Sequence, residues 1–179
     1  MKILFLSTLF AVGALACAST NAAGRLRGPL VFHAAGGYVA LTGEPGLEVR
    51  ALRRSPDGEP GFVWPRGDLE ALLRHPDLAR VDLPAEGDTG TVVNRRGECL
   101  SLDPLANSPA WLPCSTAFRG QRWTHENGRL ANLRTAGSLD FWPGYSQRGT
   151  FILSKGDQEL TVVAAVLQPV TDDPGDTSP

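Results

Sequence analysis

The sequence is poor in the residues on which metal sites, enzymes and membrane spans depend. Only three histidines and three cysteines occur among 179 residues, and the histidines are isolated from one another, so no metal-ligand spacing is present. The motifs of serine hydrolases, zinc proteases and phosphate-binding loops are also missing, which argues against an enzyme. The formal net charge is only −2, which argues against nucleic acid as the partner. We therefore expect a non-enzymatic protein without a cofactor.

A long apolar stretch occurs only at the N-terminus. The run from Ile3 to Ala16 follows a positively charged start, is too short to span a membrane and leads into small residues. This pattern predicts a secretory signal peptide over residues 1–23, cleaved after Ala18 or Ala23, and a secreted or periplasmic protein. In an alternative interpretation the segment resembles a lipoprotein cleavage site, and Cys17 carries a lipid anchor. The remaining chain has no apolar run of transmembrane length, so we expect no membrane span.

Two cysteines remain once the predicted signal peptide is set aside. In a chain exported to an oxidising compartment, Cys99 and Cys114 are most simply interpreted as one disulfide. It would close a loop of about 16 residues, for which a stabilisation of about 3 kcal/mol is typical. A zinc site is a weaker alternative because no histidine lies near either cysteine, and a redox pair would have closer spacing.

Glycine and proline, with 20 and 14 residues, are scattered along the chain, which favours many short strands separated by turns. Within this pattern, residues 28–41, 90–102 and 128–141 share one template: each begins with glycine, enters an apolar strand, turns through a glycine and returns in a second strand. Another apolar strand and a spaced pair of residues follow each hairpin. We therefore expect an all-β chain of three degenerate repeats. The spaced pairs are Phe62 and Trp64, Gln121 and Trp123, and Gln158 and Leu160.

The regions between and after the repeats have a different composition. Residues 67–75 have an acidic start, good helix formers and a basic end followed by proline, which predicts a short helical insertion between the first and second repeats. The apolar residues 161–167 are predicted to form a closing strand. The folded domain should extend over residues 28–168. The acidic, proline-rich residues 169–179 are expected to form a disordered tail.

The second repeat carries the residues with the clearest family likeness. Its segments Gly97-Glu-Cys-Leu100, Pro113-Cys114 and Gln121-Arg-Trp123 resemble a ricin B-type repeat, in which a Gly-x-Cys-Leu strand, a second cysteine and a Gln-x-Trp ending recur three times. The other two repeats resemble this pattern in outline. The resemblance implies a single β-trefoil, in which three units share one core around a pseudo-threefold axis.

Two structural expectations follow from the resemblance. Trp64, Trp123 and Leu160 should be equivalent core residues that pack around a common centre. Gln121 should hold its own loop by hydrogen bonds to nearby backbone groups.

The resemblance also implies where a sugar would bind. Sugar pockets of this family use an acid two places after the first cysteine position, an aromatic residue on the next strand and polar residues beside the glutamine. A carboxylate accepts hydrogen bonds from sugar hydroxyls, and an aromatic ring packs against the apolar face of the sugar. The first and second repeats have Ala40 and Ser101 at the acidic position. The third fits better, and its candidate carbohydrate-binding residues are Asp140, Trp142, Phe151, Asp157 and Gln158. In the alternative interpretation Asp140 caps a turn, and Trp142 and Phe151 belong to the core.

The resulting hypothesis is a secreted, ricin-type carbohydrate-binding protein that attaches to glycans on a cell surface. Because one shallow pocket binds weakly, attachment would need several copies or a partner subunit. A secreted chain with a single trefoil and degenerate pockets is similar to the cell-binding subunits of cytolethal distending toxins. One alternative is a Kunitz-type trefoil inhibitor with a bait residue among Arg53, Arg54, Arg66 and Arg119. Another is a structural trefoil that binds a protein partner.

Overall fold

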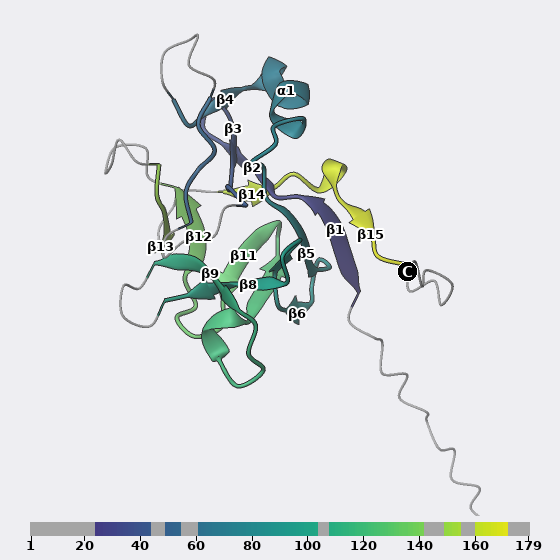
Figure 1. Cartoon of the computed structure of the whole chain (residues 1–179), viewed down its shortest axis with the longest axis vertical. Helices are drawn as coiled ribbons and strands as arrows, with labels where there is room; N and C mark the ends of the chain where they lie inside the picture. The colour runs from purple at the N-terminus through teal and green to yellow at the C-terminus, as the bar shows by residue number, and fades with distance from the viewer. Residues whose placement is uncertain are drawn as a thin grey trace, which may run out of the picture.

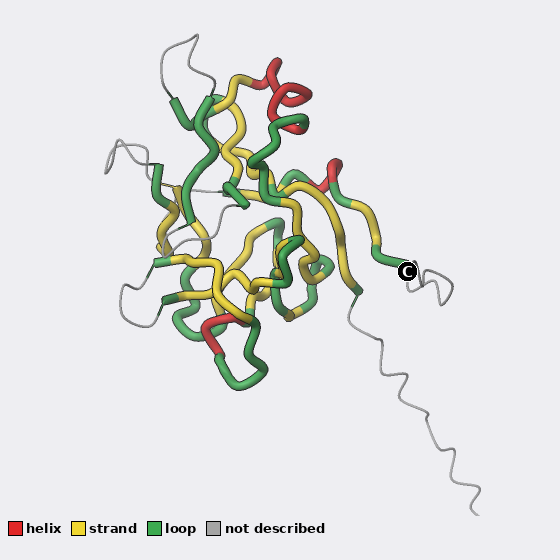
Figure 2. Tube along the Cα trace, viewed as in Figure 1, coloured by secondary structure: helices red, strands yellow, loops and turns green. Residues whose placement is uncertain are grey.

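The computed structural model describes residues 24–43, 49–54, 61–103, 108–141, 149–154 and 160–171. Within these residues the chain forms short antiparallel strands, one short α-helix and three single-turn 3-10 helices. The helical segments lie at the periphery of the strands (Figures 1 and 2). The expected all-β class is therefore confirmed. The predicted signal segment, 1–23, and residues 172–179 of the predicted tail lie outside the described residues.

The strands and helices follow one another along the chain without long regular elements. The elements are β1 (Arg25–Pro29), β2 (Val31–Ala34), β3 (Gly37–Ala40), β4 (Trp64–Pro65), η1 (Arg66–Asp68), α1 (Leu69–Leu73), β5 (Arg80–Pro84), β6 (Thr89–Gly90), β7 (Val93–Asn94), β8 (Glu98–Leu102), β9 (Pro109–Pro113), η2 (Arg119–Gln121), β10 (Trp123–Glu126), β11 (Arg129–Asn132), β12 (Ser138–Phe141), β13 (Phe151–Ser154), β14 (Thr161–Val162), η3 (Ala164–Val166) and β15 (Gln168–Pro169).

The described strands form three sheets, and each sheet contains one of the three predicted hairpins. The sheet orders are β15-β1-β5-β7-β8-β9, β13-β12-β11-β10-β6 and β14-β2-β3-β4. The hairpins β2–β3, β7–β8 and β11–β12 are antiparallel. Strand β8 continues into a pair with β9, and β12 into a pair with β13. The second and third predicted repeats, which we call units from here on, thus contain the hairpin and the strand that follows it. In the first unit, Leu41 pairs with Ala51 by an isolated bridge.

The turns of the second and third hairpins are held by the same kind of hydrogen bond to an asparagine side chain. The Asn94 side-chain oxygen accepts hydrogen bonds from the backbone N–H groups of Arg96 and Glu98, at 2.9 and 3.0 Å. The Asn132 side-chain oxygen accepts one from the backbone N–H of Arg134, at 3.0 Å. Asparagine favours such turns because its side chain replaces a backbone acceptor. The two hairpins are therefore related in detail, beyond their shared apolar pattern.

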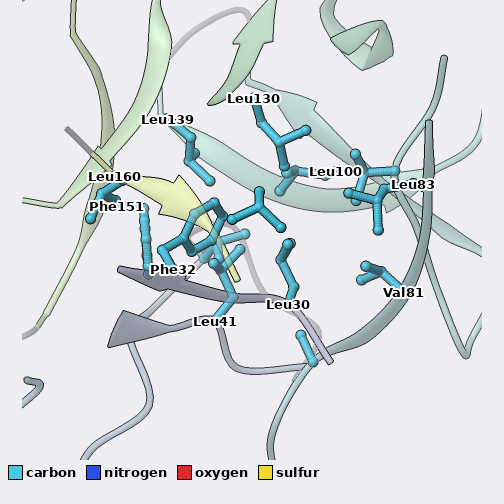
Figure 3. Packing of buried hydrophobic residues seen from close by; sticks show 14 of the residues in the cluster. Leu30, Phe32, Leu41, Val81, Leu83, Leu100, Leu130, Leu139, Phe151 and Leu160 are labelled. Carbon is cyan, nitrogen blue, oxygen red and sulfur yellow. The ribbon is translucent and has the colours of Figure 1, made fainter. Parts of the chain in front are cut away.

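The main hydrophobic core draws its side chains from all three sheets. Figure 3 shows leucine and phenylalanine side chains from segments far apart in the sequence pointing into a common interior. Such a shared interior is expected when each hairpin unit alone has too little apolar surface to form a core. The labelled residues are Leu30, Phe32, Leu41, Val81, Leu83, Leu100, Leu130, Leu139, Phe151 and Leu160.

The expected common centre of Trp64, Trp123 and Leu160 forms only in part. Trp123 and Leu160 belong to the main core, whereas Trp64 belongs to a second cluster together with Leu72. Strand β4 leads directly into η1 and α1, and the Trp64 ring makes an edge contact with His75, with ring centroids 6.0 Å apart. The insertion therefore provides a separate small core for the first unit, and the predicted equivalence of Trp64 with Trp123 is wrong.

The predicted helical insertion is present as η1 and α1, between the first and second hairpins (Figure 1). The predicted closing strand is shorter than expected. Only β14 is extended, and η3 follows before β15 pairs with β1, where Leu26 lies opposite Pro169. Because Val170 also donates a backbone hydrogen bond to Arg25, the first residues of the predicted tail belong to a sheet.

Candidate functional site

The Gln121 side chain forms a buried corner in the second unit. Its side-chain oxygen accepts a hydrogen bond from the Ser115 backbone N–H at 2.6 Å. Its side-chain nitrogen donates to the Pro113 carbonyl and to the Ser101 hydroxyl, both at 2.8 Å. The expectation that Gln121 holds its own loop is confirmed. Two residues later, the fully buried Trp123 donates its indole N–H to the Leu100 carbonyl at 2.7 Å.

The predicted disulfide lies beside this corner. Cys99 and Cys114 are bonded, with Cα atoms 5.0 Å apart. Cys99 lies in β8, and Cys114 directly follows β9, its partner strand. The disulfide and Gln121 therefore fix the same loop, which connects β9 to η2.

The three positions at which the family would place a sugar-binding acid are all buried. Ala40, Ser101 and Asp140 occupy corresponding places in β3, β8 and β12 and are 0%, 0% and 5% exposed. The Ser101 hydroxyl donates to the Cys99 carbonyl at 2.9 Å and accepts from Gln121. Asp140 accepts a hydrogen bond from the Phe141 backbone N–H at 2.7 Å. One oxygen of the predicted sugar-binding carboxylate is thus already bound within the protein.

Phe151, the predicted aromatic platform, is a core residue. Its side chain is fully buried, and its ring contacts those of Phe32 and Phe141, with centroids 6.0 and 5.5 Å away. A ring in this position offers no face to a sugar, so the alternative interpretation of Phe151 is the one that agrees with the structure. The other predicted site residues, Trp142, Asp157 and Gln158, lie outside the described residues.

A concave surface lies beside β1, β5 and the β7–β8 turn, and we call it the arginine groove. It consists of two adjoining hollows. The first has a volume of about 660 Å³ and is lined by Arg27, Arg80, Asp82, Asn94, Arg95 and Gln168, among others. A second hollow of about 190 Å³ shares Arg80, Asn94 and Arg95 with the first and adds Asp77 and Arg96. The combined size is in the range of about 300–1,000 Å³ that is usual for small-molecule sites.

Strand register explains why these side chains meet. In the β1–β5 pair, Arg27 lies directly opposite Asp82, and Arg80 points to the same face as Asp82 because side chains alternate along a strand. Val81 and Leu83, on the opposite face, belong to the core. The charged face of this pair is therefore turned outward.

Arg27 and Asp82 form a two-pronged ion pair across the strands. Asp82 accepts hydrogen bonds from Arg27 Nε at 2.7 Å and from Nη2 at 2.9 Å. The Arg27 hydrogen bond lowers the pKa of Asp82 below its ordinary value, against an opposing effect of partial burial and with further help from the charges of Arg27 and Arg25. Asp82 therefore stays ionised into acidic solution and keeps Arg27 in place.

The arginine groove was not among the features predicted from the sequence. Only Arg95 and Arg96 are neighbours in the chain, and a pair of basic residues in a turn is usually only a solvated surface. Arg27 and Arg80 join them through strand pairing between distant segments. No local sequence pattern predicts that these arginines lie together.

No protein-family model matches the chain, and no curated protein and no solved structure matches it. The described residues contain no group of three or more histidine, cysteine, aspartate or glutamate side chains that could hold a metal ion. None of the helices in this part of the chain combines the length and apolar composition needed to cross a membrane.

Proposed function

We propose that the protein is a secreted, non-enzymatic carbohydrate-binding protein with a ricin B-type β-trefoil fold. The observation that carries the proposal is the Gln121 corner, in which one glutamine joins Ser101, Pro113 and Ser115 two residues before the buried Trp123. The resemblance assigns this role to the Gln-x-Trp glutamine. The three hairpins and the disulfide agree with it. A fold of this kind supports several functions, so the sugar-binding activity needs its own test.

Asp140 remains the proposed sugar-binding acid of the third unit. Its carboxylate has one oxygen bound by the Phe141 N–H, and a carboxylate can accept several hydrogen bonds. In the proposal its second oxygen accepts hydrogen bonds from sugar hydroxyls. The aromatic contribution must then come from a residue other than the buried Phe151.

A glycan array with the mature chain tests this proposal. We expect the wild-type protein to bind at least one glycan class and Asp140→Asn, which keeps an oxygen for the Phe141 N–H, to bind it more weakly because the charge is lost. Asp68→Ala is a matched control, since Asp68 precedes α1 without a side-chain capping bond. Wild-type protein that binds no glycan would overturn the function, and unchanged binding by Asp140→Asn would overturn the role of Asp140.

The inhibitor alternative has less structural support at two of its four bait candidates. Arg66 and Arg119 lie in the 3-10 helices η1 and η2, whereas a bait residue must lie in an extended loop that a protease can accept as substrate. Arg53 and Arg54 lie outside the helices and strands. Stoichiometric inhibition of a trypsin-like protease would nevertheless favour this alternative over the lectin proposal.

A surface-attachment role has its own test. The mature protein should bind to cells, and an excess of the free glycan that it recognises should abolish this binding.

A further inference from the structure

We propose that the arginine groove is a binding site for acidic glycans, which carry sulfate or carboxylate groups. The assignment to a glycan, rather than to another anion, rests on the proposed carbohydrate-binding function. The site is separate from Asp140, because the groove is formed by β1, β5 and the β7–β8 turn, whereas Asp140 lies in β12.

The groove carries an excess of positive charge on a chain whose formal net charge is negative. Its two hollows are lined by four arginines and two aspartates. One aspartate, Asp82, is paired with Arg27, which leaves three arginines and Asp77, and hence an excess of positive charge. A concave surface with an excess of one sign of charge concentrates ligands of the opposite sign.

Two of these arginines have guanidinium groups that are free for a ligand. Arg95 and Arg96 are exposed, and neither guanidinium has a hydrogen-bond or ion-pair partner among the described residues. Arg80 is different, because its Nη2 donates to the Leu73 carbonyl at 3.0 Å. That bond fixes the Arg80 side chain, which lines both hollows.

The backbone that presents Arg95 and Arg96 is held in one conformation. Asn94 bonds the N–H groups of Arg96 and Glu98 and donates its own side-chain nitrogen to the Glu98 carboxylate at 2.9 Å. Gly97 adopts a left-handed φ of +77°, which glycine reaches without strain. The disulfide begins two residues later, at Cys99. A preformed turn reduces the entropy lost when a ligand binds.

The chemistry of the lining favours an acidic sugar over other polyanions. A guanidinium group donates two parallel hydrogen bonds to a sulfate or carboxylate, and Asp82 and Gln168 provide acceptors for sugar hydroxyls. No aromatic side chain lines either hollow among the described residues, so the stacking that proteins use to hold single-stranded nucleic acid is missing. Without stacking, a neutral sugar would also be held weakly, and the charged groups must supply most of the affinity.

Binding to heparin fragments, hyaluronan fragments and neutral dextran tests the inference in the mature protein. Heparin carries sulfates and carboxylates, and hyaluronan carries carboxylates alone, so the two probes distinguish the anionic groups. We expect heparin to bind, dextran not to bind, and R95Q/R96Q to bind heparin about tenfold more weakly or worse, because each lost charge-assisted contact weakens binding severalfold. Binding should also weaken as salt is raised.

A matched variant separates a specific groove from general charge attraction. R53Q/R134Q removes the same number of charges from exposed positions outside the groove. Arg134 also follows Asn132 in its turn as Arg96 follows Asn94. We expect this variant to bind heparin within about threefold of wild type, because neither side chain lines the two hollows and salt screens exposed charges that do not contact the ligand. Equal losses in the two double variants would overturn the inference.

The remaining outcomes distinguish this inference from the proposed function. Binding of neutral glycans that depends on Asp140, without heparin or hyaluronan binding, would overturn the groove site and leave the function intact. Duplex DNA or anionic lipid vesicles that bind as tightly as heparin would overturn the assignment to a glycan. Heparin binding that requires Arg95 and Arg96 but not Asp140 would support the groove even if the Asp140 pocket fails. Circular dichroism of R95Q/R96Q and of R53Q/R134Q should match wild type, since all four substituted positions are exposed.

Discussion

The side chains of Gln121 and Ser101 are joined by a 2.8 Å hydrogen bond although they lie twenty positions apart in the sequence. Both residues are buried. The bond connects the end of η2 to the middle of β8, on the face of that strand directed away from the main core. A polar contact of this kind stabilises the second unit independently of its disulfide.

Replacement of Gln121 should therefore destabilise the protein. Gln121→Ala removes three hydrogen bonds and leaves the Ser115 N–H and the Pro113 carbonyl without these partners, so we expect a loss of about 1–3 kcal/mol in the free energy of unfolding. Ser101→Ala removes one of these bonds and should cost about 1 kcal/mol. Urea denaturation measures both. A Gln121→Ala variant with the stability of wild type would contradict the structural role of this corner.

The hairpins were predictable because each depends on a local pattern. In residues 90–102 and 128–141 the apolar residues, the asparagine and the glycine of the turn all lie within a short segment. The disulfide was predictable for a similar reason, since only Cys99 and Cys114 remain in the predicted mature chain. Predicting such features requires no knowledge of how distant segments pack.

Features that depend on distant packing were not predictable from the same sequence. Phe151 follows a pattern that fits an exposed platform or a core residue equally well, and only its contact with Phe32, from the first unit, decides between them. Trp64 matches Trp123 in spacing, but the adjacent insertion provides it with a different set of neighbours. The arginine groove depends on the pairing of β1 with β5, which are more than 50 residues apart.

Loss of the disulfide should have a measurable but limited effect. The bond closes a loop with a sequence separation of 15, and a loop of this length gives about 3 kcal/mol of stabilisation by restricting the unfolded chain. Cys99→Ala with Cys114→Ser should lower the free energy of unfolding by about this amount in urea denaturation. Reducing agent should destabilise wild type equally and leave the double variant unchanged. A reductant effect on the double variant would show that the loss has another cause.

The Arg27–Asp82 ion pair should contribute stability only above acidic pH. The folded-state pKa of Asp82 is lowered from an ordinary value of 3.8, so its stabilisation is present above about pH 4 and is lost as the pH falls through the lowered pKa. The pair is partly exposed, with 66% of the Arg27 and 30% of the Asp82 side chain accessible, and should contribute about 0.2–1 kcal/mol.

A double-mutant cycle with Arg27→Gln and Asp82→Asn measures this contribution. We expect a favourable coupling free energy at pH 6 that decreases at a lower pH, as the Asp82 carboxylate becomes protonated below its lowered pKa. The Arg53→Gln variant serves as a control because Arg53 is exposed and distant in sequence from β1 and β5. A coupling that persists unchanged at the lower pH would contradict an ionic interaction between Arg27 and Asp82.

Substitution of Phe151 distinguishes a core role from a role in sugar binding. Phe151→Ala should lower the free energy of unfolding by about 3–5 kcal/mol, because it leaves a cavity between Phe32 and Phe141. Phe151→Leu fills most of that space, should unfold at a higher urea concentration than Phe151→Ala, and should bind glycans as wild type does, since the ring has no exposed face. Phe62→Leu is a suitable control, as Phe62 contacts Phe141 from a less buried position. A folded Phe151→Leu protein that no longer binds glycans would assign the ring to the binding site, with the consequence that β13 must move to expose it.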